Sequence, residues 1–253
     1  MSKKSKLLIA EAREYRKLGD KENTLALLHQ AIEDDSTDLV AHYLLAAIYY
    51  ELRSVEASHE YCDKVLNIDP LYKEALELKA IIHEKQEEYS LSEKYFLKGL
   101  EIDSGFHNAR YNLINLYYYK IKDYEKTAYH CEWMLKNRDS ERLAYSKQKR
   151  MKVAEIWYLQ INNIYVSSLI KLKLYQKAID AIKDQVDFCM TFVTYFPGFF
   201  HAEDEQIYKL YYLLKDNEGI LEYKNKMVNE YGISNRDLED FEKEAQNGEL
   251  RAL

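Results

Sequence analysis

The segment LNIDP, residues 66–70, recurs in a similar form at a fixed distance along the chain. Thirty-four residues later the sequence reads LEIDS (100–104), and thirty-four residues earlier it reads IEDDS (32–36). A period of this length indicates an array of small stacked units, each of which is one supersecondary element. The period therefore decides how every other residue is interpreted.

Three consecutive rows of 34 residues, 5–38, 39–72 and 73–106, hold residues of similar size at equivalent positions. The predicted first helix of each row carries a small residue followed three places later by a ring: Ala12 and Tyr15, Ala46 and Tyr49, Ala80 and His83. The predicted second helix carries three further positions of this kind: Thr24, Ser58 and Ser92; Leu28, Cys62 and Phe96; Ala31, Val65 and Gly99. Residues three, four or seven apart share one helix face, and small ones let two helices approach closely.

Each row ends with an acidic residue followed by Ser36, Pro70 or Ser104. We expect these residues to end one helix and start the next, by N-capping or through the fixed φ of proline. The composition agrees with an all-α chain, because only 2 Pro and 7 Gly interrupt a sequence that is 47% hydrophobic and 31% charged.

The pattern resembles the tetratricopeptide repeat, a 34-residue helix-turn-helix unit. The segments that carry the resemblance are AAIYYEL (46–52), KLGDKENTLALL (17–28) and KVLNIDPLYKEAL (64–76). The resemblance implies a right-handed α-α superhelix of about five to six hairpins with a C-terminal capping helix. It also implies that the first helices line a concave groove.

The resemblance divides the chain into successive repeat units. Four regular units span 5–141, the fourth being 107–141 with one extra residue near KIKDYEK (120–126). A fifth unit, 142–196, has a long first helix from about Leu143 to Leu172. Residues 197–253 form a degenerate helix pair that ends at Gly232, and then a polar capping helix that starts at Ser234 or Asn235.

Tyrosine and asparagine gather on the face of the first helices that lies opposite the small residues. A tyrosine can bury its ring against a guest while its hydroxyl stays hydrogen-bonded, and an asparagine can hold a peptide main chain. The residues predicted to bind a peptide are Arg13, Tyr43, Tyr50, Asn108, Tyr111, Asn115, Tyr118 and Asn163. The alternative, that the tyrosines pack between adjacent first helices, stays open from the sequence.

Some tetratricopeptide proteins grip a C-terminal carboxylate with a clamp of Lys, Asn and Arg side chains. The matching positions here hold Ile9 and Arg13, Leu44, and Glu74 and Leu78. The sequence therefore predicts that this clamp is absent.

No motif for catalysis, a cofactor or a metal stands out. The sequence lacks a phosphate-binding glycine loop, HExxH and CxxC, and His59 and Cys62 form an isolated pair. The net charge of −7 and the scattered basic residues argue against nucleic acid as a partner. Three separated cysteines and the lack of a long apolar run predict a cytoplasmic protein with no membrane segment.

The function predicted from these features is that of a non-enzymatic adaptor, which binds an extended peptide or protein segment in a Tyr/Asn-lined concave groove. The alternative is an assembly scaffold or self-associating protein that acts through its convex face or its C-terminal third. TYFPGFFH (194–201) motivates this alternative, because Phe196, Phe199 and Phe200 would form a costly exposed apolar patch. A homo-oligomer is one form of it.

Overall fold

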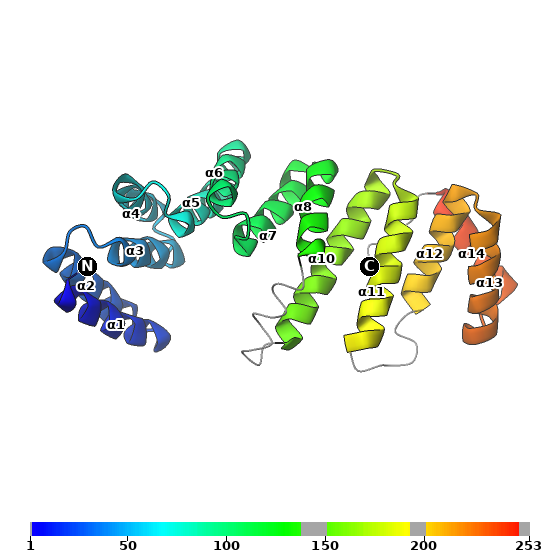
Figure 1. Ribbon diagram of the computed structural model, residues 1–253, viewed down its shortest axis with the longest axis horizontal. Helices are drawn as coiled ribbons and strands as arrows, with labels where there is room; N and C mark the ends of the chain where they lie inside the picture. Colours follow the sequence, from blue (N-terminus) through cyan, green and yellow to red (C-terminus); the bar gives the residue numbers. More distant parts are fainter. Residues whose placement is uncertain (1, 138–150, 193–200, 248–253) are drawn as a thin grey trace. The chain divides into compact units, whose positions relative to one another are not determined.

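The structure is a computed structural model that describes residues 2–137, 151–192 and 201–247. All regular secondary structure in these ranges is helical (Figure 1), so the prediction of an all-α fold is confirmed. The chain divides into two compact units, Met1–Leu116 and Tyr117–Leu253, and each is described by itself. The boundary between the compact units falls inside the predicted fourth repeat. The predicted division into repeat units stays a prediction.

The first unit consists of three helix hairpins and a further helix. Its helices are α1 (Lys3–Lys17), α2 (Lys21–Asp34), α3 (Leu39–Glu51), α4 (Val55–Ile68), α5 (Lys73–Lys85), α6 (Tyr89–Ile102) and α7 (His107–Asn115). The two helices of each hairpin pack along each other, and the successive first helices α1, α3 and α5 are also in contact. Each first helix therefore touches both its own partner and the next hairpin.

A residue with left-handed backbone conformation turns the chain inside each hairpin of the first unit. Gly19, Arg53 and Glu87, at equivalent positions of the rows, have φ values of 78°, 61° and 63°. The next residue donates its N–H to the carbonyl of the ring residue five positions back: Asp20 to Tyr15 (3.0 Å), Ser54 to Tyr49 (2.9 Å) and Glu88 to His83 (2.9 Å). This Schellman pairing satisfies carbonyls that the last helical turn leaves free.

The extra residue predicted near residues 120–126 takes the form of a short π-helical segment, η1 (Leu116–Ile121). The left-handed residue after it is Lys122, with a φ of 65°. The N–H of Asp123 reaches the carbonyl of Tyr117 at 3.1 Å, six positions back rather than five. A π-turn contains one residue more than an α-turn, so it absorbs the insertion before the second helix begins.

The turns between hairpins are closed by the aspartate of the repeated segment. Asp35, Asp69 and Asp103 each accept a hydrogen bond from the backbone N–H two residues ahead, at 3.2, 2.9 and 2.9 Å. An aspartate that bonds its own backbone in this way stabilises a tight turn. The repeated acidic residue is therefore a turn residue.

The prediction that Ser36, Pro70 and Ser104 cap the next helix is wrong. The N-cap residues lie two positions further on in each row: Asp38, Tyr72 and Phe106. The physical reason is that the aspartate turn occupies the residues in between. Only the first of the three caps uses its side chain, because the Asp38 carboxylate accepts from the N–H groups of Val40 (3.0 Å) and Ala41 (3.2 Å).

Each first helix of the first unit meets its second helix at a small residue. Ala12, Ala46 and Ala80 are fully buried, as predicted. In the second hairpin the Ser58 hydroxyl donates to the carbonyl oxygen of Ala46 at 2.8 Å, which shows how closely the two backbones approach. The predicted core positions of the second helices are also buried: Thr24, Ser58, Ser92, Leu28, Cys62, Phe96, Ala31, Val65 and Gly99.

The second unit continues with helix pairs and ends in a single helix. Its helices are α8 (Tyr124–Lys136), α10 (Met151–Lys171), α11 (Tyr175–Phe192), α12 (His201–Leu214), α13 (Asn217–Tyr231) and α14 (Asn235–Gln246). The long helix predicted from about Leu143 to Leu172 corresponds to α10, and its predicted first residues, 143–150, lie outside the described residues. α10 packs on both α8 and α11, and α12 packs on α11 and α13.

The last helix begins where the sequence predicts. Gly232, with a φ of 68°, ends α13, and Ser234 caps α14 through a capping box with Asp237. α14 packs on α12, where the fully buried ammonium of Lys209 forms ion pairs with Glu205 and with Glu244 of α14. The last helix is thus fixed to its neighbour by the ion pairs of the buried Lys209 as well as by packing.

The left-handed turn residues give a direct test of the hairpin geometry. The Cβ that Gly19→Ala adds has no atom within 4 Å, so this change should destabilise the protein through backbone strain alone, by about 1 kcal/mol. Glu87→Gly, at the equivalent position, should relieve such strain and stabilise the protein by up to about 1 kcal/mol. Denaturation midpoints followed by far-UV circular dichroism measure both effects. Equal midpoints for the three proteins would contradict the left-handed turn.

Candidate peptide-binding face

Six of the eight residues predicted to bind a peptide lie in the first unit, on its first helices and α7. We call this set the first-helix face: Arg13 on α1, Tyr43 and Tyr50 on α3, and Asn108, Tyr111 and Asn115 on α7. Arg13 and Asn108 are exposed, and the other four are partly buried. Tyr118 and Asn163 lie in the second unit, so a single groove lined by all eight stays a prediction.

Tyr43 and Tyr50 pack against the next hairpin and keep part of their surface exposed. Both lie against the buried cluster that contains Leu78 and Ile82 of α5. The ring of Tyr43 also lies 5.5 Å, between centroids, from the ring of Tyr72 at an angle of 44°. Burial, followed by the charge of Glu77, raises the pKa of the Tyr43 hydroxyl to about 12. These rings therefore contribute to packing between hairpins and still present an open edge.

Glu77 on α5 lies near Tyr43 on α3 and also connects α5 to α7. Its Oε1 accepts a hydrogen bond from Nδ2 of Asn112 on α7 at 3.0 Å. Burial, with the nearby carboxylate of Glu74 as a second cause, raises the pKa of Glu77 to about 7. A carboxyl group in this state exchanges its proton near neutral pH.

The charges of this face differ between its helices. Arg16 at the end of α1 forms an ion pair with Glu51 on α3. Glu74, Glu77 and Glu84 on α5 form no ion pair within the described part of the chain. The middle of the face is therefore acidic, while its first helix is basic.

The two predicted residues of the second unit lie in different surroundings. Tyr118 in η1 makes edge contacts with the rings of Tyr119 (4.8 Å) and Tyr124 (6.0 Å). Oδ1 of Asn163 is buried without a hydrogen-bond partner. Its neighbour Asn162, which the sequence does not single out, donates from Nδ2 to the carbonyl of Ala181 (3.1 Å) and so joins α10 to α11. Adjacent asparagines thus have different roles because they point to different sides of α10.

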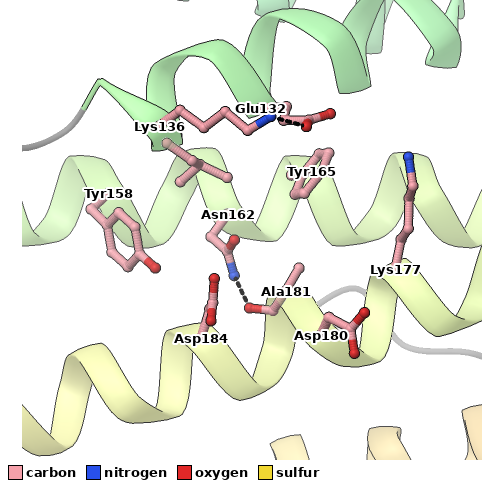
Figure 2. Close-up of a pocket in the computed structure, with 10 residues that line it drawn as sticks. Glu132, Lys136, Tyr158, Asn162, Tyr165, Lys177, Asp180, Ala181 and Asp184 are labelled. Carbon is pink, nitrogen blue, oxygen red and sulfur yellow. Dashed lines mark hydrogen bonds and ion pairs between the residues drawn. The ribbon is translucent and has the colours of Figure 1, made fainter.

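A hollow of about 450 Å³ lies in the second unit between α8, α10 and α11 (Figure 2). Its lining carries charges of both signs, from Glu132, Asp180 and Asp184 and from Lys136 and Lys177. Glu132 and Lys136 already neutralise each other in an ion pair of 2.6 Å. Sequence reasoning misses this hollow, because three separate helices contribute to it and no motif links them.

Three of the five positions of the carboxylate clamp hold apolar side chains that are buried. Ile9, Leu44 and Leu78 are buried, with exposed fractions of 4%, 8% and 7%. They belong to the apolar core between helices. A guest carboxylate would therefore meet neither charge nor amide at these three positions.

Cys62 occupies the core position that the repeat predicts. Its thiol is fully buried, and burial raises its pKa to about 12. Nε2 of His59, the other member of the isolated pair, lies 3.2 Å from Oε1 of Gln86. The described residues contain no group of three side chains that could hold a metal ion.

Across the described ranges, none of the helices combines the length and apolar character that crossing a membrane requires.

The raised pKa of Glu77 predicts a pH-dependent effect of Glu77→Gln. From the ordinary value of 4.5 up to about 7 the unfolded chain loses this proton before the folded chain does. Stability is therefore lost as the pH rises through this window. The glutamine cannot ionise, so at about pH 8 the variant should be more stable, by about 1 kcal/mol after allowance for partial exposure.

At about pH 5 the variant and the parent should unfold at the same denaturant concentration. Glu101→Gln on the exposed surface of α6 is the control, and it should show no difference between the two pH values. A Glu77→Gln variant with the same midpoint shift at both pH values would contradict the raised pKa.

Comparison with known proteins gives structural matches only. No family model matches the sequence, and no curated protein matches it significantly. A double mutant of MamA matches with a TM-score of 0.59 and 14% identity, over 77% of this chain and 99% of that one. PilF of Pseudomonas aeruginosa matches with a TM-score of 0.55 and 15% identity, over 96% of each chain.

The tetratricopeptide-repeat protein YrrB matches with a TM-score of 0.54 and 15% identity, over 87% of this chain and 97% of that one. At these identities the likeness concerns the fold. Together with the helix hairpins and their period, it shows that the chain has a tetratricopeptide-repeat fold.

Proposed function

We propose that this protein is a non-enzymatic adaptor that binds an extended peptide or protein segment on the first-helix face. One observation carries the proposal: partly exposed tyrosine rings lie on the same face as amide side chains that are free to bond a guest. The side-chain amides of Asn108 and Asn115 on α7 make no hydrogen bond within the described part of the chain. An amide of this kind can donate to and accept from the main chain of a guest, whatever its sequence.

The tyrosines supply the apolar part of the proposed contact. Tyr50 is held by the cluster that contains Leu78 and Ile82, so its ring is already ordered before a guest arrives. An ordered aromatic ring loses little conformational entropy on binding, and such rings are frequent among the residues that dominate binding energy. A contribution of Tyr118 and Asn163, which lie in the second unit, stays a prediction.

Two further observations support the choice of partner and compartment. YrrB, which shares the fold, is described as a protein with an unusual peptide-binding site. Cys62 and Cys131 are free, buried thiols, which suits the reducing conditions of the cytoplasm. We therefore propose a cytoplasmic adaptor for a peptide or protein.

The self-association alternative has no support among the described residues. It rests on Phe196, Phe199 and Phe200, which lie outside them. Self-association therefore stays a prediction.

The proposal is tested with peptides selected from a displayed library of random linear sequences, using the full chain as bait. The double variant Tyr50→Ala/Tyr111→Ala removes two rings of the first-helix face. Truncation of a ring that anchors a guest costs about 2 kcal/mol or more, so each selected peptide should bind the variant at least about 30-fold more weakly. Fluorescence anisotropy with labelled peptides measures the affinities.

Tyr129→Ala is the matched control, because Tyr129 is a tyrosine on the second helix α8 with 65% of its surface exposed. It should leave the affinities unchanged. Far-UV circular dichroism checks that all variants keep the helical fold. Peptides that bind the double variant as tightly as the parent would place the binding site elsewhere and overturn the proposal.

A further inference from the structure

Two tyrosines of the first-helix face, Tyr43 and Tyr50, each form a pair with a glutamate of α5. α3 and α5 are in contact, and Tyr43 and Tyr50 on α3 pack against the cluster that contains Leu78 and Ile82 of α5. Glu77 and Glu84 on α5 are close enough to raise the pKa of Tyr43 and of Tyr50, respectively, in each case after burial. In both pairs the glutamate follows the tyrosine by 34 residues, which is one repeat, and the pairs are seven residues apart along each helix. The period of the fold therefore places two equivalent pairs in line.

Neither glutamate has a cation as a partner within the described part of the chain. The Glu77 side chain accepts one hydrogen bond, from the uncharged amide of Asn112, and the Glu84 side chain forms no hydrogen bond or ion pair with the described residues. On α1, Arg16 is paired with Glu51, and Arg13 is close enough to Tyr72 to oppose the rise in that tyrosine's pKa.

A tyrosine ring beside a carboxylate is a combination that recognises a cation. The face of the ring is electron-rich and attracts an ammonium or guanidinium group, while the carboxylate supplies the opposite charge and hydrogen-bond acceptors. Around the first pair the ring of Tyr72, 5.5 Å from that of Tyr43, adds a second aromatic surface. The complementary guest group is therefore basic.

The distance between the pairs sets the spacing of basic groups in a guest. Seven residues of an α-helix span about 10.5 Å. A peptide in the extended polyproline II conformation advances about 3.1 Å per residue and completes a turn in three residues, so side chains three positions apart lie on the same side of the peptide, about 9 Å apart. An extended segment that lies along α3 and α5 can thus reach both pairs.

We propose, on the basis of the adaptor function above, that the guest is an extended segment with two Lys or Arg residues separated by two others. One basic side chain binds between Tyr43 and Glu77, and the other binds between Tyr50 and Glu84. Binding of a cation also favours the ionised form of Glu77, so it removes the cost of leaving that carboxylate partly buried without a counter-charge.

The selection from random linear peptides tests this pattern. The enriched sequences should share two basic residues with the stated spacing. Replacement of both by glutamine in the peptide, which leaves the protein untouched, should weaken binding at least about tenfold. The protein variant Glu77→Gln/Glu84→Gln should weaken binding of the parent peptide to a similar extent, while its circular dichroism stays that of the parent.

The control Glu56→Gln/Glu101→Gln removes two exposed carboxylates from the second helices α4 and α6. It has the same net charge as the test variant and should bind with unchanged affinity. Equal losses in the two variants would show a non-specific effect of charge and overturn the proposal.

The outcomes separate this inference from the adaptor function. Enriched peptides without the basic pair that still lose affinity for Tyr50→Ala/Tyr111→Ala would overturn the inference and support the adaptor. A failure to enrich any peptide, or peptides indifferent to both double variants, would overturn both.

Discussion

The close approach of two helices at an alanine is the constraint on which the rest of this structure depends. Ala46 is fully buried, and the hydroxyl of Ser58 reaches its carbonyl across the hairpin. A larger side chain at such a point would force the helices apart or push neighbours off their preferred rotamers, at a cost of about 1–3 kcal/mol. The contact fixes which face of the first helix turns toward its partner, and therefore which face stays available for a guest.

The part of the fold that lies within one hairpin could be predicted from the sequence. Small residues and rings at fixed offsets define the buried face of a helix, because the α-helical period relates sequence spacing to direction. The same holds for local backbone signals. Gly232 followed by Ser234 marks the end of one helix and the cap of the next, and the structure has both at these residues.

Features that depend on how the chain passes between helices were harder to predict. The serines and the proline at the row ends are predicted to be helix caps, because these residue types favour helix starts. In the structure the preceding aspartate stabilises a turn at this place. The carboxylate of Asp69, for example, accepts a hydrogen bond from the N–H of Leu71. An aspartate carboxylate can accept hydrogen bonds from a turn or from the start of a helix, and the path of the backbone decides which of the two it does.

The properties of the candidate site depend on distances between hairpins, which a single sequence does not contain. Tyr43 and Glu77 are recognisable as members of one face, yet the raised pKa of Glu77 needs the burial that neighbouring hairpins provide. The same limit applies to the asparagine pair on α10. Asn162 turns into the core toward Ala181, whereas the prediction concerned only Asn163.

A repeat aligns surface groups for the same reason that it aligns the core. Tyr43, Glu77 and Tyr111 are each one repeat apart, so they take equivalent places on successive first helices of the first unit. A residue inserted into an α-helix would rotate every following side chain by about 100° and end this alignment. The extra residue is confined to the π-helical segment between α7 and α8, and α8 still buries Cys131 and Met134. The insertion therefore leaves the packing of α8 unchanged. The regular alignment of surface groups belongs to the first unit, which is where we propose that the basic segment binds.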